Sequence, residues 1–314
     1  GACRMQKYSK IIGVLTVVAI ASSMPGSAAG KPSVFVSINP QKYFVQQIGK
    51  DLVDIQVMVQ PGASPASYEP KPRQMAAIAK TLIYFSIGVP FEEVWLNKIA
   101  SSNPNMMVVQ TEHGIQKIPM ADHHHHRGAA DHRDTDGHAE NKHGNVENQR
   151  DHGILDPHIW LSPPLVMIQA RTILVALQKV DPVHRSDYEA NFKTFISEIT
   201  KLDAELKNIF SSRQGLQFMV FHPAWGYFAD TYGLKQIPVE IEGKNPKPAQ
   251  LKELIKYANQ NEINVIFVQP QFSAKSAEVI ARGIGGQVVF ADPLAEEWSV
   301  NLRKVAREIR AALK

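Results

Sequence analysis

Histidine is concentrated in one segment of this 314-residue chain, and imidazole is a side chain that binds transition metals. Residues 121–152 contain eight of the twelve histidines, seven carboxylates and a single large apolar residue, Val146. Such a polar segment cannot form a core and is predicted to be a disordered loop. Clustered neutral imidazoles recruit zinc, copper or nickel. The histidines of this low-affinity loop site are His123, His124, His125, His126, His132, His138, His143 and His152.

Two other interpretations of this histidine-rich loop compete with metal recruitment. The loop could be a solvated polar connection only, or residues 123–126 could be a purification tag. A tag is usually terminal and homogeneous, whereas this tract is internal and interrupted by Asp residues. Metal recruitment is therefore the favoured interpretation.

A second set of candidate ligands follows predicted strands. His222 comes directly after a strand predicted at 217–221, Asp292 follows one at 287–290, and His158 lies just beyond the loop. In open parallel sheets, ligands bind beyond the carboxyl ends of the strands. Two imidazoles and one carboxylate are good zinc donors, with a fourth position open to water or another oxygen. Taken singly, His222 or Asp292 could instead cap the helix that follows it.

Residues beside these candidate ligands suggest how the ligands are supported. Asp156 could orient an imidazole as a hydrogen-bonded partner outside the metal's own ligands. Trp160 and Trp225 lie close to His158 and His222 in sequence and could shield a cleft from water. Glu240 lies at the end of a strand predicted at 236–241 and could line the cleft or contact a partner protein; the sequence does not decide its role.

The scaffold is predicted from short β-rich runs that alternate with helical stretches. Strands are expected at 34–37, 55–59, 82–85, 106–109, 217–221, 236–241, 263–268 and 287–290. Helices are expected at 41–49, 72–80, 91–100, 161–179, 249–260, 274–283 and 296–313, with a short one from Pro223 through Tyr227. This alternation favours mostly parallel sheets flanked by helices.

One helix is predicted to be much longer, from 183 to 211. Its apolar residues recur every three or four positions and form one stripe, which comprises Tyr188, Phe192, Phe195, Ile199, Leu202, Leu206 and Ile209. About 29 residues at roughly 1.5 Å each give a rod near 43 Å. The predicted fold class is therefore α/β, with two lobes bridged by one long rigid helix and a metal site in the cleft between them. The expected boundaries are 30–180 for the N-terminal lobe, 182–212 for the linking helix and 213–314 for the C-terminal lobe.

Residues 1–29 have the pattern of a secretory signal peptide. A positive start is followed by an apolar run at 11–20 and by small residues that end at Ala29, where cleavage is expected. Cleavage would remove Cys3, the single cysteine, so thiolate ligands, disulfides and a lipid anchor are not expected. The expected location is a bacterial periplasm.

Composition excludes other classes of function. The net charge of +4 is dispersed, and no basic patch is interleaved with aromatic residues, so nucleic acid is not an expected partner. Neither a zinc-hydrolase HExxH motif nor a GxSxG motif occurs, so the chain is not expected to be an enzyme.

Four stretches together resemble the metal-specific substrate-binding proteins of bacterial ABC importers, the group that delivers zinc or manganese. They are PGASPASYEP (61–70), DPHIWLSP (156–163), FHPAWGYFADTYGL (221–234) and VQPQFSAKSAEVIARGIGGQVVFADPL (268–294). The resemblance implies a monomeric receptor that hands its metal to an inner-membrane permease. It also implies that His158 and His222 ligate the metal and that Asp292 ligates it or lies beside it. A histidine-rich loop is typical of the zinc-binding members.

One position departs from that family pattern. Where these proteins usually have a first histidine ligand, this chain has Ala66, with Ser64 where Asp often stands. Tyr68 or Glu69 could donate oxygen instead, solvent or a loop histidine could fill the gap, or the site could be weakened, whether naturally or by engineering. Zinc is favoured, since manganese prefers hard oxygen ligands and would gain little from a histidine-rich loop. A manganese or iron receptor is the alternative, and a periplasmic zinc buffer or a zinc hydrolase is less favoured.

Overall fold

The computed structural model describes residues 30–121, 154–212, 215–241 and 244–313. The predicted signal peptide and nearly all of the histidine-rich loop lie outside the described residues. Residues Lys31–Lys314 form one compact unit, and the description below concerns that unit alone.

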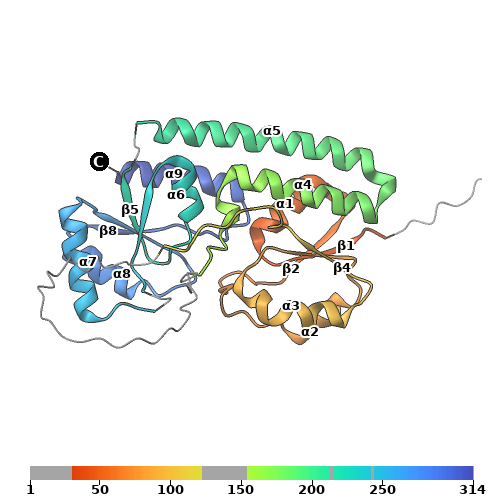
Figure 1. The fold of residues 1–314 in the computed structure, drawn as a ribbon, viewed down its shortest axis with the longest axis horizontal. Coiled ribbons are helices and arrows are strands. Elements are labelled where there is room, and N and C mark those ends of the chain that lie inside the picture. The colour runs from red at the N-terminus through yellow and green to blue at the C-terminus, as the bar shows by residue number, and fades with distance from the viewer. Residues whose placement is uncertain (1–29, 122–153, 213–214, 242–243, 314) are drawn as a thin grey trace, which may run out of the picture. The chain divides into compact units, whose positions relative to one another are not determined.

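The first lobe is built on a four-stranded parallel sheet with strand order β2-β1-β3-β4. Helices cover both of its faces, with α1 and α4 on one and α2 and α3 on the other (Figure 1). The strands are β1 (Ser33–Val36), β2 (Asp54–Val57), β3 (Ile83–Ser86) and β4 (Met107–Gln110). The helices are α1 (Asn39–Gly49), α2 (Pro72–Ile78), α3 (Pro90–Ser102) and α4 (Pro163–Val180).

The second lobe repeats this plan with a parallel sheet of strand order β6-β5-β7-β8. Its strands are β5 (Gln217–Val220), β6 (Lys235–Pro238), β7 (Val265–Val268) and β8 (Gln287–Phe290). Its helices are α6 (Gly226–Tyr232), α7 (Pro248–Gln260), α8 (Lys275–Gly283) and α9 (Trp298–Ala312). The prediction of two α/β lobes with parallel sheets is confirmed.

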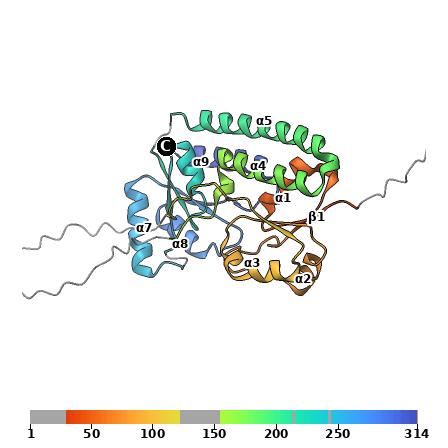
Figure 2. The same ribbon diagram turned by 45° about the vertical axis from the view of Figure 1, so that its right-hand side comes forward.

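The long helix α5 (Arg185–Phe210) contacts α1 and α4 of the first lobe and α6 and α9 of the second. Figures 1 and 2 both show it running along the two lobes. Its 26 residues span roughly 39 Å. It is shorter than predicted because a 3₁₀ turn, Pro182–His184, precedes it. The predicted stripe faces inward: Tyr188, Phe195, Ile199, Leu202 and Leu206 are buried.

Proline sets the start of several helices. Pro72, Pro90, Pro163 and Pro248 each stand at the first position of their helix, where a missing N–H leaves no hydrogen bond unmade. Pro223 does not act in this way. The helix predicted from Pro223 begins only at Gly226, because residues 221–225 form a turn in which the Ala224 N–H donates to the His222 carbonyl at 2.8 Å. His222 therefore stays in a loop at the carboxyl end of β5.

Two tryptophans connect the lobes through hydrogen bonds and apolar packing. Trp160, just before α4, donates from Nε1 to the Pro293 carbonyl of the second lobe at 2.7 Å. Trp298 of α9 donates in turn to the Trp160 carbonyl at 2.7 Å. Both indoles are buried in one hydrophobic cluster that also includes Phe44 of the first lobe and Phe228 of the second. The interface between the lobes is therefore an apolar core that also contains hydrogen bonds.

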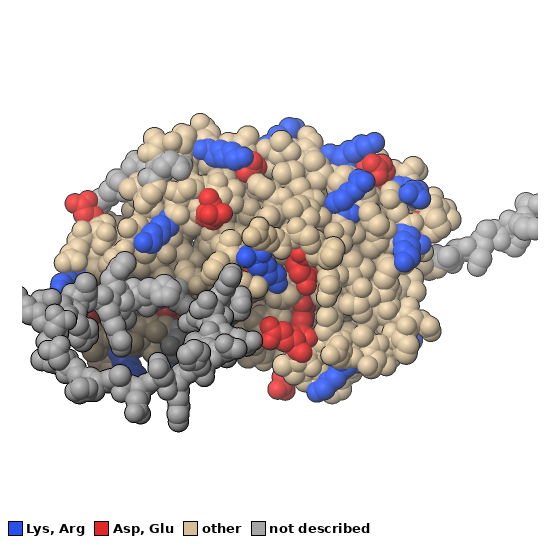
Figure 3. Space-filling model, in the orientation of Figure 1, with Lys and Arg blue, Asp and Glu red and all other residues tan. Residues whose placement is uncertain are grey.

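The surface carries both signs of charge. Basic and acidic side chains are interspersed on the face in Figure 3, and several carboxylates lie close together near its middle. Among the helices that the structure describes, none combines the length and the apolar character needed to cross a bilayer.

Candidate metal centre

A cavity of about 70 Å³ lies where the carboxyl ends of the two sheets face each other. From the first lobe it is lined by Ser64, Pro65 and Ala66 after β2, and by Val89 and Pro90 after β3. The second lobe contributes His222, Gln271, Phe272, Pro293 and Leu294. His158 and Trp160, which precede α4, complete the wall with Met120 and Pro157. The turn after β2 and the residues after β5 and β8 therefore meet here, as the rule for parallel sheets leads one to expect.

Two imidazoles lie next to each other, edge to face, in the wall of this cavity. The ring centroids of His158 and His222 are 5.3 Å apart, and the rings are inclined at 72°. His158 is only 8% exposed, and the side chain of His222 is 19% exposed. The structure thus brings together two of the three metal ligands predicted from the sequence.

A carboxylate holds each imidazole by its Nδ1 atom. Asp156 Oδ1 lies 2.7 Å from His158 Nδ1 and also accepts the backbone N–H of His158 at 2.8 Å. Glu240 Oε1 lies 2.6 Å from His222 Nδ1. An Nδ1–H donated to a carboxylate leaves Nε2 with its lone pair free for a cation, and the carboxylate raises the basicity of that nitrogen. Asp156 is therefore hydrogen-bonded to an imidazole as predicted, and Glu240 makes the corresponding hydrogen bond to His222.

Burial keeps His158 in the form that binds metal. Desolvation lowers the pKa of its imidazole, and the charge and hydrogen bond of Asp156 oppose that shift only in part. The neutral ring is the form that can donate a lone pair to a metal.

Strand register places the partners of His222. Strand β5 pairs with β6 at an offset of 18 residues, as in Val220 with Pro238, and with β7 at an offset of 47, as in Val220 with Phe267. Continued beyond the strand ends, these offsets bring Glu240 and Gln269 beside His222. Gln269 accepts the backbone N–H of His222 at 3.3 Å and donates to its carbonyl at 2.7 Å. The backbone of His222 is therefore held on both sides.

Aromatic rings pack against both imidazoles. Phe272 stacks on His222 with a centroid distance of 4.9 Å and an angle of 22° between the rings. Trp160 lies 5.1 Å from His158. Trp160 therefore lines the cavity, whereas Trp225, the other tryptophan predicted to shield it, does not. The contribution of Phe272 has no signal in the sequence beyond its place after a predicted strand.

Asp292 lies beside the histidine cavity rather than in its wall. It lines an adjoining cavity of about 250 Å³, and Gln271 and Leu294 line both. Its Oδ1 accepts from Gln271 Nε2 at 3.0 Å and from the Leu294 N–H at 2.9 Å. In the part of the chain that the structure describes, no group of three or more His, Cys, Asp or Glu residues is already arranged to hold a metal.

The residues considered as substitutes for the first histidine lie elsewhere. Ala66 itself lines the cavity, so the missing side chain would have pointed towards this site. Tyr68 is buried against Phe91 and donates its hydroxyl to Gln74 Oε1 at 2.8 Å. Glu69 is exposed, and neither Tyr68 nor Glu69 lines the cavity.

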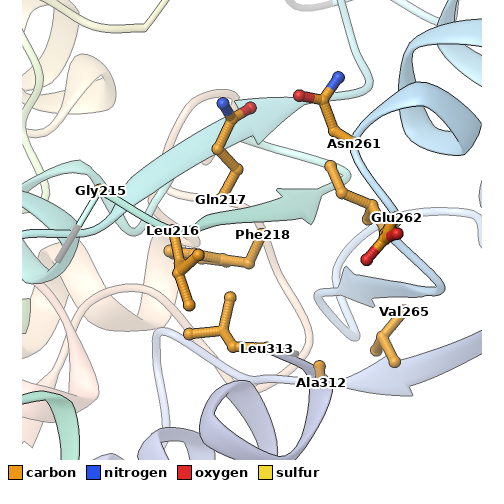
Figure 4. A pocket seen from close by; sticks show the side chains of 10 residues that line it. Gly215, Leu216, Gln217, Phe218, Asn261, Glu262, Val265, Ala312 and Leu313 are labelled. Atoms are coloured by element: carbon orange, nitrogen blue, oxygen red, sulfur yellow. The ribbon is translucent and has the colours of Figure 1, made fainter. Parts of the chain in front are cut away.

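A larger cavity, of about 190 Å³, lies near the amino-terminal ends of β5 and β7. Figure 4 shows its lining, which includes Gln217, Asn261, Glu262 and Leu313. No imidazole is among the residues that line it. It lies at the opposite end of these strands from His222 and has no part in the metal site.

The chain matches one protein-family model over residues 34–312, and that family is described as ZnuA, zinc-uptake complex component A, periplasmic. The chain belongs to this family. The high-affinity zinc uptake system protein ZnuA of Bacillus subtilis (strain 168) is 29% identical over 275 residues, covering 85% of this chain and 80% of the relative. The iron-binding protein YfeA of Yersinia pestis is 25% identical over 292 residues, with coverages of 90% and 85%. A crystal structure of ZnuA has a TM-score of 0.78 and 40% identity, and covers 90% of this chain and 99% of that one.

Membership of this family confirms the resemblance inferred from the four sequence stretches. The chain is a metal-binding receptor of an ABC-type uptake system, and it belongs to a family of zinc-type periplasmic receptors rather than of enzymes.

Proposed function

We propose that this receptor captures one zinc ion between His158 and His222 and presents it to the permease. A ring whose Nε2 lies about 2.05 Å from zinc has its centroid about 3.2 Å from the ion, so two such rings at the tetrahedral angle have centroids about 5.2 Å apart. The observed separation is 5.3 Å. This agreement, together with the carboxylate on each Nδ1, is the observation that carries the proposal.

Asp292 is proposed as an oxygen ligand of the same ion. Both hydrogen bonds that it accepts go to Oδ1, which leaves Oδ2 for a cation. Because Asp292 lines the adjoining cavity, a small movement of its own loop must bring it to the metal. Its negative charge would offset the charge of the ion, which neutral imidazoles cannot do.

Zinc titration by calorimetry tests the cleft site. The full chain would carry asparagine at the eight loop histidines, so that only the cleft can bind tightly. We expect one tight site that His158→Ala or His222→Ala weakens at least about a hundredfold, since each removes a nitrogen ligand. His113→Ala is the matched control, because His113 is exposed and does not line the cavity. Equal binding by His222→Ala and by the parent would refute the cleft site.

The histidine-rich loop is proposed as a collector of low affinity that raises the zinc concentration near the cleft. Residues 1–29 are proposed to direct export, so that the receptor works in the periplasm as a monomer. Calorimetry of the intact chain should then show additional weak sites that the loop-substituted chain lacks. Identical isotherms for the two chains would remove the collector role.

Manganese or iron is the alternative cargo, because the absence of a side-chain donor at Ala66 makes the nitrogen set smaller than a three-histidine site. Elemental analysis of protein purified without added metal separates these cargoes. Zinc in the cleft at close to one equivalent is the expected result.

A further inference from the structure

Gln271 is a cavity-wall residue whose amide oxygen has no hydrogen-bond donor among the described residues. It follows β7 and lines the same cavity as His158, His222 and Ala66. Its Nε2 donates to Asp292 Oδ1 at 3.0 Å. Its Oε1 is buried and has no hydrogen-bond partner among the described residues.

The orientation of this amide follows from its neighbour. Exchanging its nitrogen and oxygen would set Oε1 against a carboxylate oxygen of Asp292, and neither atom could donate. Nε2 must therefore face Asp292, and Oε1 must be the free atom. A buried carbonyl oxygen without a donor is rare in folded proteins and calls for an explanation.

A cation in the cavity would give this oxygen the electropositive partner that it lacks. Ser64 Oγ, on the same wall, already accepts the Ala66 N–H at 3.2 Å and keeps one further lone pair. Tyr68 and Glu69 do not line the cavity. Among the described residues that line this cavity, Gln271 is the one with a buried side-chain oxygen that lacks a hydrogen-bond partner.

We propose that Gln271 Oε1 is a metal ligand that takes the place of the histidine absent at Ala66. This inference rests on the proposed zinc site between His158 and His222. The same amide holds Asp292 through Nε2, so one side chain supplies a ligand and positions another. The resulting set is two imidazole nitrogens and two oxygens, which favours zinc less strongly over manganese than three imidazoles would.

Four variants of the loop-substituted full chain test this assignment by zinc calorimetry. They are Gln271→Leu, Gln271→Glu, Ala66→His and the double variant Ala66→His/Gln271→Leu. We expect Gln271→Leu to weaken zinc binding about tenfold or more, because it removes the oxygen while keeping the volume. Gln271→Glu should keep the parent affinity or exceed it, since a carboxylate oxygen still coordinates.

The double variant separates ligation from support of Asp292. With an imidazole restored at position 66, the loss of Gln271 should change zinc affinity less than about threefold. An equal loss in both backgrounds would mean that Gln271 acts only through Asp292 and would overturn the proposal.

Two controls keep these outcomes interpretable. Gln287→Leu changes an exposed glutamine on β8 and should bind zinc as the parent does, and thermal unfolding of the metal-free variants checks their folding. His222→Ala distinguishes a failure of the proposed cleft site from a failure of the role proposed for Gln271. If His222→Ala leaves binding intact, the proposed cleft site itself fails. If His222→Ala abolishes binding while Gln271→Leu does not alter it, only the role of Gln271 fails.

Discussion

Glu240 lies 2.6 Å from Nδ1 of His222 because β5 and β6 pair at an offset of 18 residues, the same offset that separates the two side chains. The carboxylate is 6% exposed, so its bond to the imidazole is made away from water. The sheet that forms the second lobe therefore also fixes which nitrogen of His222 faces the cavity.

Removing the charge of Glu240 should weaken zinc binding. We expect Glu240→Gln to lower affinity roughly tenfold to a hundredfold, because a neutral amide supports a positively charged metal–imidazole unit less well. Calorimetry of the loop-substituted chain measures the change. Glu253→Gln, an exposed change on α7, is the control. Unaltered affinity in Glu240→Gln would show that the carboxylate does not tune the ligand.

Much of this arrangement is predictable from residue patterns. Period-two and period-3.6 patterns locate the strands and helices, and the position of His222 directly after a strand marks it as a candidate ligand. The partners of His222 are not predictable in this way. Glu240 and Gln269 are 18 and 47 residues away, and only the strand register brings them beside the imidazole. A single sequence shows where strands are but not how they align.

The orientation of Asp292 is a second feature that the sequence alone does not predict. Its position after β8 correctly puts it at the carboxyl edge of the sheet, next to the site. Whether it faces the imidazoles depends on the side chain of Gln271, which lies in the walls of both cavities. The relative positions of these side chains depend on packing between loops that are far apart in the chain.

Stacking on His222 should stabilise the bound state. Phe272→Leu removes the ring that lies 4.9 Å from the imidazole. An aromatic pair contributes about 0.5–1.5 kcal/mol beyond its buried area, so we expect a loss of zinc affinity of about twofold to tenfold. Stopped-flow release of zinc to a chelator should be faster by a similar factor. Phe290→Leu is the matched control, since Phe290 is 57% exposed on β8. Equal release rates in the two variants would argue against a role for the stack.

Trp160 should report on the metal. Its ring lies 5.1 Å from His158, and its Nε1 bonds to the Pro293 carbonyl of the other lobe. We expect zinc to change the intrinsic fluorescence of the parent and Trp160→Phe to lose most of that change. The same variant should lower the free energy of unfolding by about 1–3 kcal/mol, through the lost hydrogen bond and the smaller ring. Trp95→Phe on α3 should retain the fluorescence response, and if it does not, the signal does not arise at Trp160.

Zinc in the cleft should persist to lower pH than zinc in the loop. Burial lowers the pKa of His158, so protons compete for its nitrogen only below the range near 6.5 that is usual for exposed histidine. Zinc content after dialysis at pH 7.5, 6.5 and 5.5 tests this order of release. The intact chain should lose its extra equivalents first and approach the content of the loop-substituted chain. Retention of the extra zinc at pH 5.5 would contradict the prediction.

Glu92 should make the stability of the metal-free protein depend on pH. Its carboxylate accepts the N–H groups of Ile87 and Gly88 and a bond from Ser37, yet burial outweighs these bonds and raises its pKa from 4.5 to about 7. The folded state then binds more protons than the unfolded state between these values. The stability that the protonated group contributes is therefore complete below pH 4.5 and is lost as pH rises through 7.

Glu92→Gln removes that titration. Between pH 4.5 and 8, the free energy of unfolding of the parent should fall by about 2–3 kcal/mol relative to that of this variant. Urea unfolding at several pH values in chelator measures it. Glu93→Gln, which changes an exposed side chain on the same helix, should leave the parent's profile unaltered. A constant difference between the parent and Glu92→Gln across this range would mean that Glu92 is already ionised throughout. Its hydrogen bonds to the turn between β3 and α3 would then outweigh its burial.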